Sequence, residues 1–510
     1  MVTSGFTEIE RKYDVGEAGC LPTLSGVKDV AAVGQLVELE LEAVYFDTPD
    51  LDLARHGVTL RRRTGGQDGG WHLKFPEGSD TRTEVRLPLG RAVKTVPTRL
   101  LPAVRALIRD RPLAPVATVT TRRLEYSLTG DDGIVLAQIC DDTVHAERLH
   151  GSFEARDWRE WEVELVAGPR SLLNDVERHL IDAGAFPAKA TSKLVRALGD
   201  AAPPVTTKPT RKTLARGSAA DLLIAHVAHH TSRLHHDDAG VRTERDGSVH
   251  QLRIAARHLR AALSSYQPLF TPNAADPLRE ELRWLGQTLS EARDAQVLRK
   301  RLGLLLAGEP AELVLGPVKH RVDAELDAAY RTGRQKSLEA LDSDRYYRLL
   351  DALDVFVTSA PLTREADQPA RKIVSKLLKR DAKRLRRAVR QSKRARHGEE
   401  SDLALHEVRK RAKRLRYAAE LATPVLGAPA RALAAGAERV QETLGEHQDA
   451  VIAREKLRQY GDQAHLDGEN EFTFGRLHAL EQGRADQAER DFTRAWAKLR
   501  RRRLRASLCD

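Results

Sequence analysis

The chain has 510 residues, a formal net charge of +11 and only 5% aromatic residues. This length exceeds one ordinary domain core, so we expect about two to four domains. The positive charge favours acidic partners such as polyphosphate or nucleotides. Scarce aromatic residues and missing DNA- or RNA-recognition motifs disfavour nucleic acid as a partner.

Three widely separated cysteines, Cys20, Cys140 and Cys509, lack the paired spacing of a disulfide framework or a cysteine zinc site. No run of about 18 apolar residues occurs, so we expect no membrane partner. The N-terminus has no basic stretch followed by an apolar one, which predicts a cytoplasmic location.

The first predicted strand contains Glu8, Glu10 and Lys12. Side chains alternate between the two faces of a strand, so these three share one face. Two carboxylates offer hard oxygen ligands for Mg²⁺ or Mn²⁺, and the ammonium suits a phosphate oxygen. The alternative is an ordinary solvated sheet face, because a pattern of three charges is a weak motif.

Residues 1–199 predict an α+β domain of about eight hairpin-linked strands, with short helices at 98–109 and 171–183. Further strands are expected at 37–47, 58–63, 71–75, 81–89, 116–128, 133–144 and 158–166. Such strands suggest an antiparallel barrel or a strongly curved sheet. Residues 144–157 are predicted to form a long loop, which leaves the register of the last strands uncertain.

Several of these strands share an unusual feature, a wholly polar face that carries both signs of charge. The residues on these faces are Arg61 and Arg63, then His72 and Lys74, then Arg82, Glu84 and Arg86, and finally Glu160, Glu162 and Glu164. A solvated outer face would explain any one strand. Repetition across strands of one sheet favours a closed barrel with a charged lumen, in which basic groups hold a polyanion and acids hold the bridging metal.

In this order, the residues resemble the CYTH domain of the triphosphate tunnel metalloenzymes. The resemblance rests on Glu8-x-Glu10-x-Lys12, Arg61-x-Arg63, Lys74, Arg82-x-Glu84, Glu162-x-Glu164 and Ser192-Lys193. It implies an eight-stranded antiparallel tunnel that binds a triphosphate and hydrolyses or rearranges it with Mg²⁺ or Mn²⁺ as cofactor. Metal could bridge phosphate oxygens and activate a water for in-line attack.

The resemblance also assigns roles residue by residue. It implies metal-binding or catalytic roles for Glu8, Glu10, Asp141, Glu162 and Glu164, and triphosphate-binding roles for Lys12, Arg61, Arg63, Lys74, Arg82, Glu84, Arg123 and Lys193. Two positions are choices between neighbours. Asp141 is preferred to Asp142, and Arg123 is preferred to Arg122 because alternation places it opposite Leu124. The spacing does not identify which carboxylate acts as the base.

Residues 200–217 contain three prolines among small, polar and basic residues, and are predicted to be an extended linker. From residue 218 the pattern changes to long amphipathic helices. We expect them at 219–235, 249–266, 277–307, 310–333, 344–358, 370–396, 402–421, 428–457 and 471–504.

An internal repeat divides this helical half. The motif at His250, Arg253, Arg257 and Arg260 recurs at His406, Arg409, Lys413 and Arg416. Each copy precedes a second motif that ends at Asp294 or at Asp449. We therefore expect an all-α domain, residues 218–505, of two duplicated four-helix bundles at about 218–360 and 365–505. Helical spacing places each His with its three cations on one stripe.

The helical half resembles the CHAD domain, which is named for its histidines. The resemblance implies that the two basic stripes face a shared cleft that holds inorganic polyphosphate, with His250 and His406 at the hallmark positions. A metal role for these histidines is the rival interpretation, which the surrounding Arg and Lys disfavour. Asp294 and Asp449 are expected to orient basic residues, or to form plain interhelical ion pairs.

The sequence thus predicts metal-dependent hydrolysis of inorganic tripolyphosphate to pyrophosphate and phosphate by the tunnel domain, and separately long-chain polyphosphate binding by the helical domain, with association with polyphosphate granules. One alternative is a non-catalytic polyphosphate-granule scaffold. The other is a tunnel enzyme that acts on an organic triphosphate such as thiamine triphosphate or ATP.

Overall fold

The computed structural model describes residues 6–24, 26–78, 80–91, 94–204, 209–245, 247–396 and 398–503. The chain forms two compact units, Met1–Thr206 and Thr207–Asp510. Part of the predicted linker, 205–208, and the end of the predicted helical domain, 504–505, lie outside the described residues.

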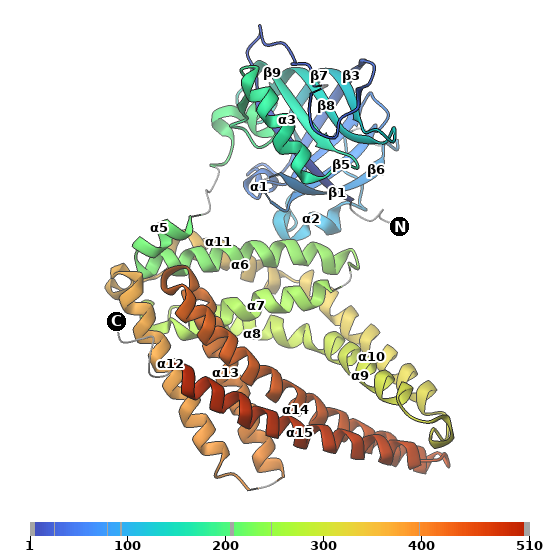
Figure 1. Ribbon diagram of the computed structural model, residues 1–510, viewed down its shortest axis with the longest axis vertical. Coiled ribbons are helices and arrows are strands. Elements are labelled where there is room, and N and C mark those ends of the chain that lie inside the picture. The colour runs from blue at the N-terminus through green and yellow to red at the C-terminus, as the bar shows by residue number, and fades with distance from the viewer. Residues whose placement is uncertain are drawn as a thin grey trace. The chain divides into compact units, whose positions relative to one another are not determined.

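The first unit is a closed antiparallel barrel (Figure 1). Its strands are β1 (Phe6–Asp14), β3 (Val37–Asp47), β4 (Thr59–Thr64), β5 (Gly70–Pro76), β6 (Thr81–Pro88), β7 (Ala114–Thr129), β8 (Val135–Arg148) and β9 (Glu154–Leu165), and two short strands, β2 (Ala32–Val33) and β10 (Phe186–Pro187), pair at its edges. The order is β1-β6-β5-β4-β3-β7-β8-β9, and pairing of β9 with β1 closes the ring. The predicted eight-stranded antiparallel tunnel is confirmed.

The last two long strands differ from the sequence-based expectation. Strands β8 and β9 pair continuously from Ala137 opposite Leu165 to Arg148 opposite Glu154. The predicted long loop at 144–157 is therefore wrong, and a short connection joins the strands. This pairing fixes which side chains of β8 face the interior.

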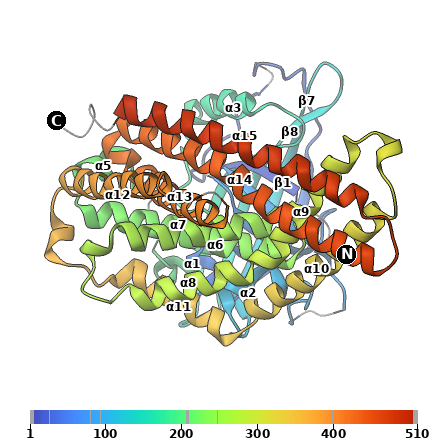
Figure 2. The ribbon, with the colours of Figure 1, turned by 90° about the horizontal axis from the view of Figure 1, so that it is seen from below.

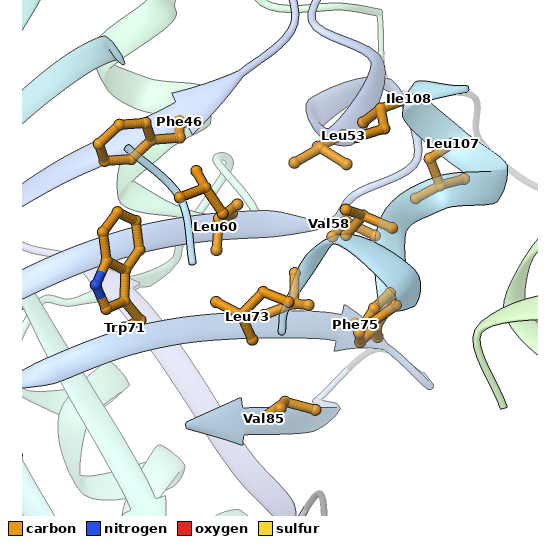
Figure 3. Close-up of a cluster of buried hydrophobic side chains, with 14 of the residues drawn as sticks. Phe46, Leu53, Val58, Leu60, Trp71, Leu73, Phe75, Val85, Leu107 and Ile108 are labelled. Carbon is orange, nitrogen blue, oxygen red and sulfur yellow. The ribbon is translucent and has the colours of Figure 1, made fainter. Parts of the chain in front are cut away.

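Helices cover the outside of the barrel where its strands are apolar. Side chains from β3 to β6, such as Leu60, Trp71 and Leu73, are buried against α1 (Asp52–Arg55) and α2 (Leu101–Ile108), as Figure 3 shows. On another side, α3 (Arg170–Asp182) packs on Trp161 and Val163 of β9. Because apolar residues take the outward positions, the alternating charged residues of the same strands point inward.

One end of the barrel is filled by helix α4 (Lys193–Leu198). Its Leu194 and Leu198 are fully buried and pack with the inward-facing Val119 and Val144. The Ser192 side chain caps the helix by accepting a hydrogen bond from the Val195 amide at 3.2 Å. This arrangement places Lys193, the first residue of the helix, beside the charged interior.

The second unit is all helical. It contains α5 (Arg211–Arg216), α6 (Ala219–Arg242), α7 (Ser248–Ser265), α8 (Asp276–Thr288), α9 (Ser290–Ala307), α10 (Val318–Leu341), α11 (Asp344–Ser359), α12 (Ala370–Ser392), α13 (Glu399–Leu426), α14 (Ala428–Leu466) and α15 (Phe472–Arg503). Helix α5 lies within the segment that was expected to be an extended linker, where Thr210 caps its N-terminus. Every helix among the described residues is too short or too polar to cross a lipid bilayer.

The two sequence repeats occupy equivalent helices. The first motif lies on α7 and its copy on α13, and these helices pack together. The second motif lies on α8–α9 and on the long α14, which runs beside α15 (Figures 1 and 2). The predicted helix 277–307 divides at Leu289. Its neighbours Thr288 and Ser290 donate hydrogen bonds back to the carbonyls of the preceding turn, which bends helices.

Candidate functional sites

The acidic and basic side chains of strand β1 lie inside the barrel and pair with neighbouring strands. Lys74 donates a hydrogen bond to Glu8 at 2.6 Å, and the Arg82 Nε lies 3.1 Å from a Glu10 oxygen. Lys12 lies 3.2 Å from Glu10 and donates a hydrogen bond to Glu162. Burial raises the pKa of Glu10, but Lys12 and Lys74 outweigh it and bring the pKa down to about 2.

The choice of Asp141 as an interior acid is wrong. Asp141 lies on the opposite face of β8, where Arg159 donates to it at 2.8 Å. Asp142 is the interior residue; it is fully buried and receives two hydrogen bonds from Arg123, at 2.8 and 2.7 Å. The choice of Arg123 over Arg122 agrees with the structure, because Arg122 is exposed and pairs with Glu38.

Lys193 sits in a cage of three carboxylates. Its Nζ lies 2.8 Å from Asp142, 2.6 Å from Glu160 and 2.7 Å from Glu162. These oxygens are close enough together to hold a metal ion, but Lys193, Arg123 and Lys12 already supply three positive charges to the three carboxylates. Burial lowers the pKa of Lys193, and the carboxylates reverse this effect and raise the pKa well above its usual range.

Beside this cage, three arginines lie close together in the interior. Arg61 and Arg63 project from β4 toward Arg123 of β7, and the acid that pairs with Arg63 is Asp68, in the partly exposed β4–β5 connection. Burial, followed by repulsion from Arg61 and Arg123, lowers the pKa of Arg63 to about 9. Arg123 is compensated by Asp142 and Glu162, so Arg63 is the cation whose repulsion a bound anion would relieve.

A second group of carboxylates contains one, Glu164, that neighbouring cations do not compensate. Glu10 and Glu164 are directly opposite each other on β1 and β9, and Glu8 is two residues away on the same face. Burial and repulsion from Glu8 raise the pKa of Glu164 to about 7. The Glu8 Oε2 atom is buried without a hydrogen-bond partner. An orphaned carboxylate oxygen beside two further acids fits a divalent cation that takes hard oxygen ligands.

Glu84 has a supporting position. It is fully buried, and it bonds to His72 at 2.6 Å and to Arg86 at 2.8 Å. Burial raises the pKa of Glu84, whereas the hydrogen bond from His72 and the charge of Lys74 lower it to a greater extent. Glu84 therefore orients interior cations.

The sequence interpretation assigned no role to two further interior groups. Glu160 shares a face with Glu162, as alternation indicated, and it completes the cage around Lys193. The Tyr45 hydroxyl accepts a hydrogen bond from Arg61 at 3.3 Å. The pairing of β3 with β4 places Tyr45 opposite Arg61. Alternation alone indicates the face on which Tyr45 lies, and the strand register is needed to identify this contact.

In the helical unit, the basic stripe on α7 lies against the one on α13. We call their six cations the basic cluster: Arg253, Arg257, Arg260, Arg409, Lys413 and Arg416. Arg253 bonds to Ser290 at 2.9 Å and to the exposed Asp294 at 3.3 Å. Burial, together with the charges of Arg409 and Arg257, lowers the pKa of Lys413 to about 7. The cluster therefore holds more positive charge than its acidic neighbours compensate.

Individual members of the basic cluster differ in their surroundings. Burial lowers the pKa of Arg260 and of Arg409, and the Arg409 Nε is buried without a hydrogen-bond partner. Arg416, in contrast, lies 2.7 Å from Glu420 and 2.9 Å from Glu438. Arg416 is therefore the best compensated cation of the predicted set.

The two hallmark histidines flank the basic cluster. The His406 Nδ1 lies 2.6 Å from the Gln448 amide oxygen. Burial and nearby cations lower the pKa of both His250 and His406, with Arg293 the leading cation for His250 and Lys410 for His406. In neutral His406 the single N–H, on Nδ1, is donated to Gln448, so donation from Nε2 to a phosphate oxygen requires the protonated ring. Asp449 faces Arg409 and Lys413, in keeping with an orienting role.

Comparisons with known proteins agree with both halves of the chain. A CYTH domain model matches residues 7–197, and a CHAD domain model matches residues 225–458. Two Mycobacterium tuberculosis proteins described as uncharacterized, MT2285 of strain CDC 1551 and Rv2226 of strain H37Rv, are 39% identical over 97% of this chain and 96% of theirs.

Several solved structures each resemble part of the chain. PptA from Streptomyces chartreusis is 21% identical, with a TM-score of 0.46 over 55% of this chain and 99% of its own. The CHAD domain from the plant Ricinus communis is 24% identical, with a TM-score of 0.44 over 55% of this chain and 93% of its own. PH1819 from Pyrococcus horikoshii is 18% identical, with a TM-score of 0.23 over 37% of this chain and 96% of its own.

Proposed function

Because this chain belongs to the family of proteins that join a CYTH domain to a CHAD domain, we propose that its barrel hydrolyses inorganic triphosphate with a divalent metal and that its helical unit binds inorganic polyphosphate. Members of the CYTH family are triphosphatases or cyclases that act on phosphates. Hydrolysis of tripolyphosphate to pyrophosphate and phosphate is the specific reaction of this proposal.

The crowding of cations inside a closed barrel is the observation that carries the proposal. Arg63 and Arg123 lie in the interior with Arg61, and the pKa of Arg63 falls to about 9 because burial and like charges disfavour its charged form. A triphosphate would supply the missing negative charge. Guanidinium groups suit this task because they bind phosphate oxygens in a bidentate manner.

The residues that would hold the metal are Glu8, Glu10 and Glu164. The buried, unpartnered Glu8 oxygen and the mutual repulsion of these acids fit such a site. When bound, Mg²⁺ or Mn²⁺ supplies a Lewis acid that polarises a phosphoryl oxygen and lowers the pKa of a bound water. The three carboxylates of the cage are less suitable ligands because Lys193 already occupies the space between them.

The barrel's own residues position the substrate and neutralise its charge. Lys12, which lies between Glu10 and Glu162, and Lys193 border the interior from β1 and α4. Their charges, with those of the arginines, stabilise the negative charge on the equatorial oxygens of the transferred group. Helix α4 fills one end of the barrel with apolar side chains, which favours a short linear anion over a substrate that threads through.

The helical unit is proposed to bind the longer polyanion. Its basic cluster joins equivalent stripes from the two repeats, and the pKa of Lys413 in this cluster falls to about 7 because burial and neighbouring cations disfavour its charged form. A chain of phosphates can bridge cations on both helices at once. This geometry supports polyphosphate over a single phosphate group.

A substrate panel tests the assignment against its two alternatives. Purified full-length protein is incubated with Mn²⁺ or Mg²⁺ and with tripolyphosphate, ATP or thiamine triphosphate, and released phosphate is measured together with polyphosphate binding. We expect fastest turnover with tripolyphosphate. Faster turnover of an organic triphosphate would reassign the substrate, whereas polyphosphate binding without any phosphate release would indicate a scaffold.

A further inference from the structure

Three histidines gather in the helical unit beside the basic cluster but outside the proposed phosphate sites. His226 and His230 lie one turn apart on α6, and His258 lies on α7. The ring of His230 lies 4.1 Å from that of His258 and 4.4 Å from that of His226, between centroids. One nitrogen of each ring lies within 4.8 Å of the others.

These imidazoles are partly buried and carry no charge at neutral pH. Burial is the main reason that the pKa of His226 falls to about 3 and that of His258 to about 4. The Nδ1 atom of His258 is buried without a hydrogen-bond partner. A buried polar atom without a partner is costly, and a neutral imidazole nitrogen with a free lone pair is the ligand that transition metals take from histidine.

The charged groups around the histidines determine which kind of ion they suit. Arg416 and Arg257 face His258, and Arg233 faces His230, so the environment disfavours a hard cation held by charge alone. Glu420 of α13 provides a carboxylate oxygen 3.8 Å from the His258 Nε2. Glu420 also pairs with Arg416 and faces Nε2 rather than the unpartnered Nδ1, so the donor set is the three imidazoles, which is typical of zinc and its neighbours in the first transition row.

We propose that His226, His230 and His258 bind one divalent transition metal of the zinc class as its three protein ligands. Zinc–nitrogen bonds of about 2.1 Å in a tetrahedral site bring two ligand nitrogens to about 3.4 Å apart. The rings of His230 and His258 are stacked at an interplanar angle of 11°. Imidazole nitrogen lone pairs lie in the ring plane, so the lone pairs of these two rings lie in nearly parallel planes and do not point at a common ion. Binding therefore turns one of these rings until the lone pairs converge.

The proposed ion has a structural role. It links α6 to α7 through the histidines. Helix α7 carries one of the two basic stripes, so the metal fixes the position of this stripe relative to α6. This site is chemically distinct from the Glu8, Glu10 and Glu164 site, whose oxygen ligands suit Mg²⁺ or Mn²⁺.

Cobalt substitution tests the proposal in the full-length protein, prepared without a polyhistidine tag and stripped of metal by chelator. Co²⁺ in a tetrahedral site absorbs strongly in the visible range, whereas octahedral Co²⁺ on oxygen ligands absorbs weakly. We expect one equivalent of strongly absorbing Co²⁺ that Zn²⁺ displaces, and a Tm that rises with added Zn²⁺. Absence of the strong absorption from the folded wild-type protein would overturn the proposal.

Variants locate the ion. The double variant His226→Gln/His258→Gln is expected to lose the strongly absorbing equivalent and the Zn²⁺-dependent rise in Tm. The exposed His320→Gln on α10 and the barrel variant Glu10→Gln are expected to keep both. If the double variant does not fold, as judged by circular dichroism, the single variant His230→Gln replaces it and is expected to lose the strong absorption. An unchanged spectrum in either folded variant would refute the assignment.

Discussion

At the scale of single residues, Lys193 and Lys413 are buried cations in opposite electrostatic situations. Lys193 is surrounded by three carboxylates, and its pKa lies well above the usual range even though burial alone would lower it. Lys413 is buried among arginines, and its pKa falls to about 7. Lys193 is therefore firmly charged and fixed in place, whereas Lys413 gains its full charge only when an anion binds nearby.

Asp142 and Asp141 provide a matched test of the barrel interior. Asp142→Asn removes the anion that positions Arg123 and Lys193, so we expect tripolyphosphate turnover to fall by about 100-fold, the typical cost of misplaced catalytic groups. Asp141→Asn alters only the pair with Arg159 on the other face, and turnover is expected to stay near the wild-type rate. Equal losses in the two folded variants would contradict the inward placement of Asp142.

Lys413 makes polyphosphate affinity depend on pH. A polyanion raises the pKa of Lys413 above its free value of about 7, so binding is strongest below pH 7 and weakens as the pH rises through it. A single proton limits this weakening to about tenfold per pH unit. Fluorescence titration with polyphosphate between pH 6.5 and 9 measures the effect, in a range where His250 and His406 are neutral.

Lys413→Arg is the control for this prediction. Its guanidinium stays charged over the whole range, so the affinity of this variant should be nearly flat between pH 6.5 and 9. A slope equal to that of the wild-type protein would mean that another group titrates.

At the scale of elements, α4 connects local helix chemistry to the charged interior. The Ser192 cap sets where this short helix begins, and Lys193 is its first residue. Ser192→Ala should destabilise the barrel by about 1 kcal/mol and reduce turnover, because Lys193 is no longer held in its cage. Ser192→Thr keeps a capping hydroxyl and should restore both properties. Thermal melting and phosphate release check this prediction, and an inactive, fully folded Ser192→Thr variant would contradict it.

Strand alternation explains why much of the barrel could be predicted from the sequence. Period-two patterns placed Glu8, Arg61 and Glu162 on inward faces without any knowledge of partners. The register of the last strands could not be predicted from the sequence. The segment after Val144 was predicted to be a long loop, yet it extends β8, and the continuous pairing with β9 shows that Asp142 faces inward.

Sequence patterns did not predict the contacts between segments that are distant along the chain. The cage around Lys193 depends on α4 folding back onto strands β8 and β9, which no local pattern encodes. The division of the helix at Leu289 depends on two hydroxyl groups that bond to the backbone. Tertiary packing determines both the position of α4 and the division of this helix. The two repeats could be predicted because duplication preserves the spacing of their motifs in the sequence.

At the scale of the whole molecule, the account assigns separate ligands to the two compact units. Arg409→Ala removes a buried cation from the basic cluster, and we expect polyphosphate affinity to fall by about 10- to 100-fold, the typical loss for a hydrogen bond to a charged group. Tripolyphosphate turnover should be unaffected. Binding and phosphate release, measured on one full-length preparation, test this, and equal loss of both would show that the units do not act independently.

The central claim, that the barrel is a metal-dependent triphosphatase, is tested most directly by phosphate release from tripolyphosphate. Full-length wild-type protein and Glu10→Gln are compared with Mg²⁺, with Mn²⁺ and with chelator. The account predicts release that requires metal and that Glu10→Gln abolishes, because this substitution removes a charged oxygen ligand from the proposed metal site. Release that persists in chelator, equal release by Glu10→Gln, or no release from folded wild-type protein with either metal would contradict it.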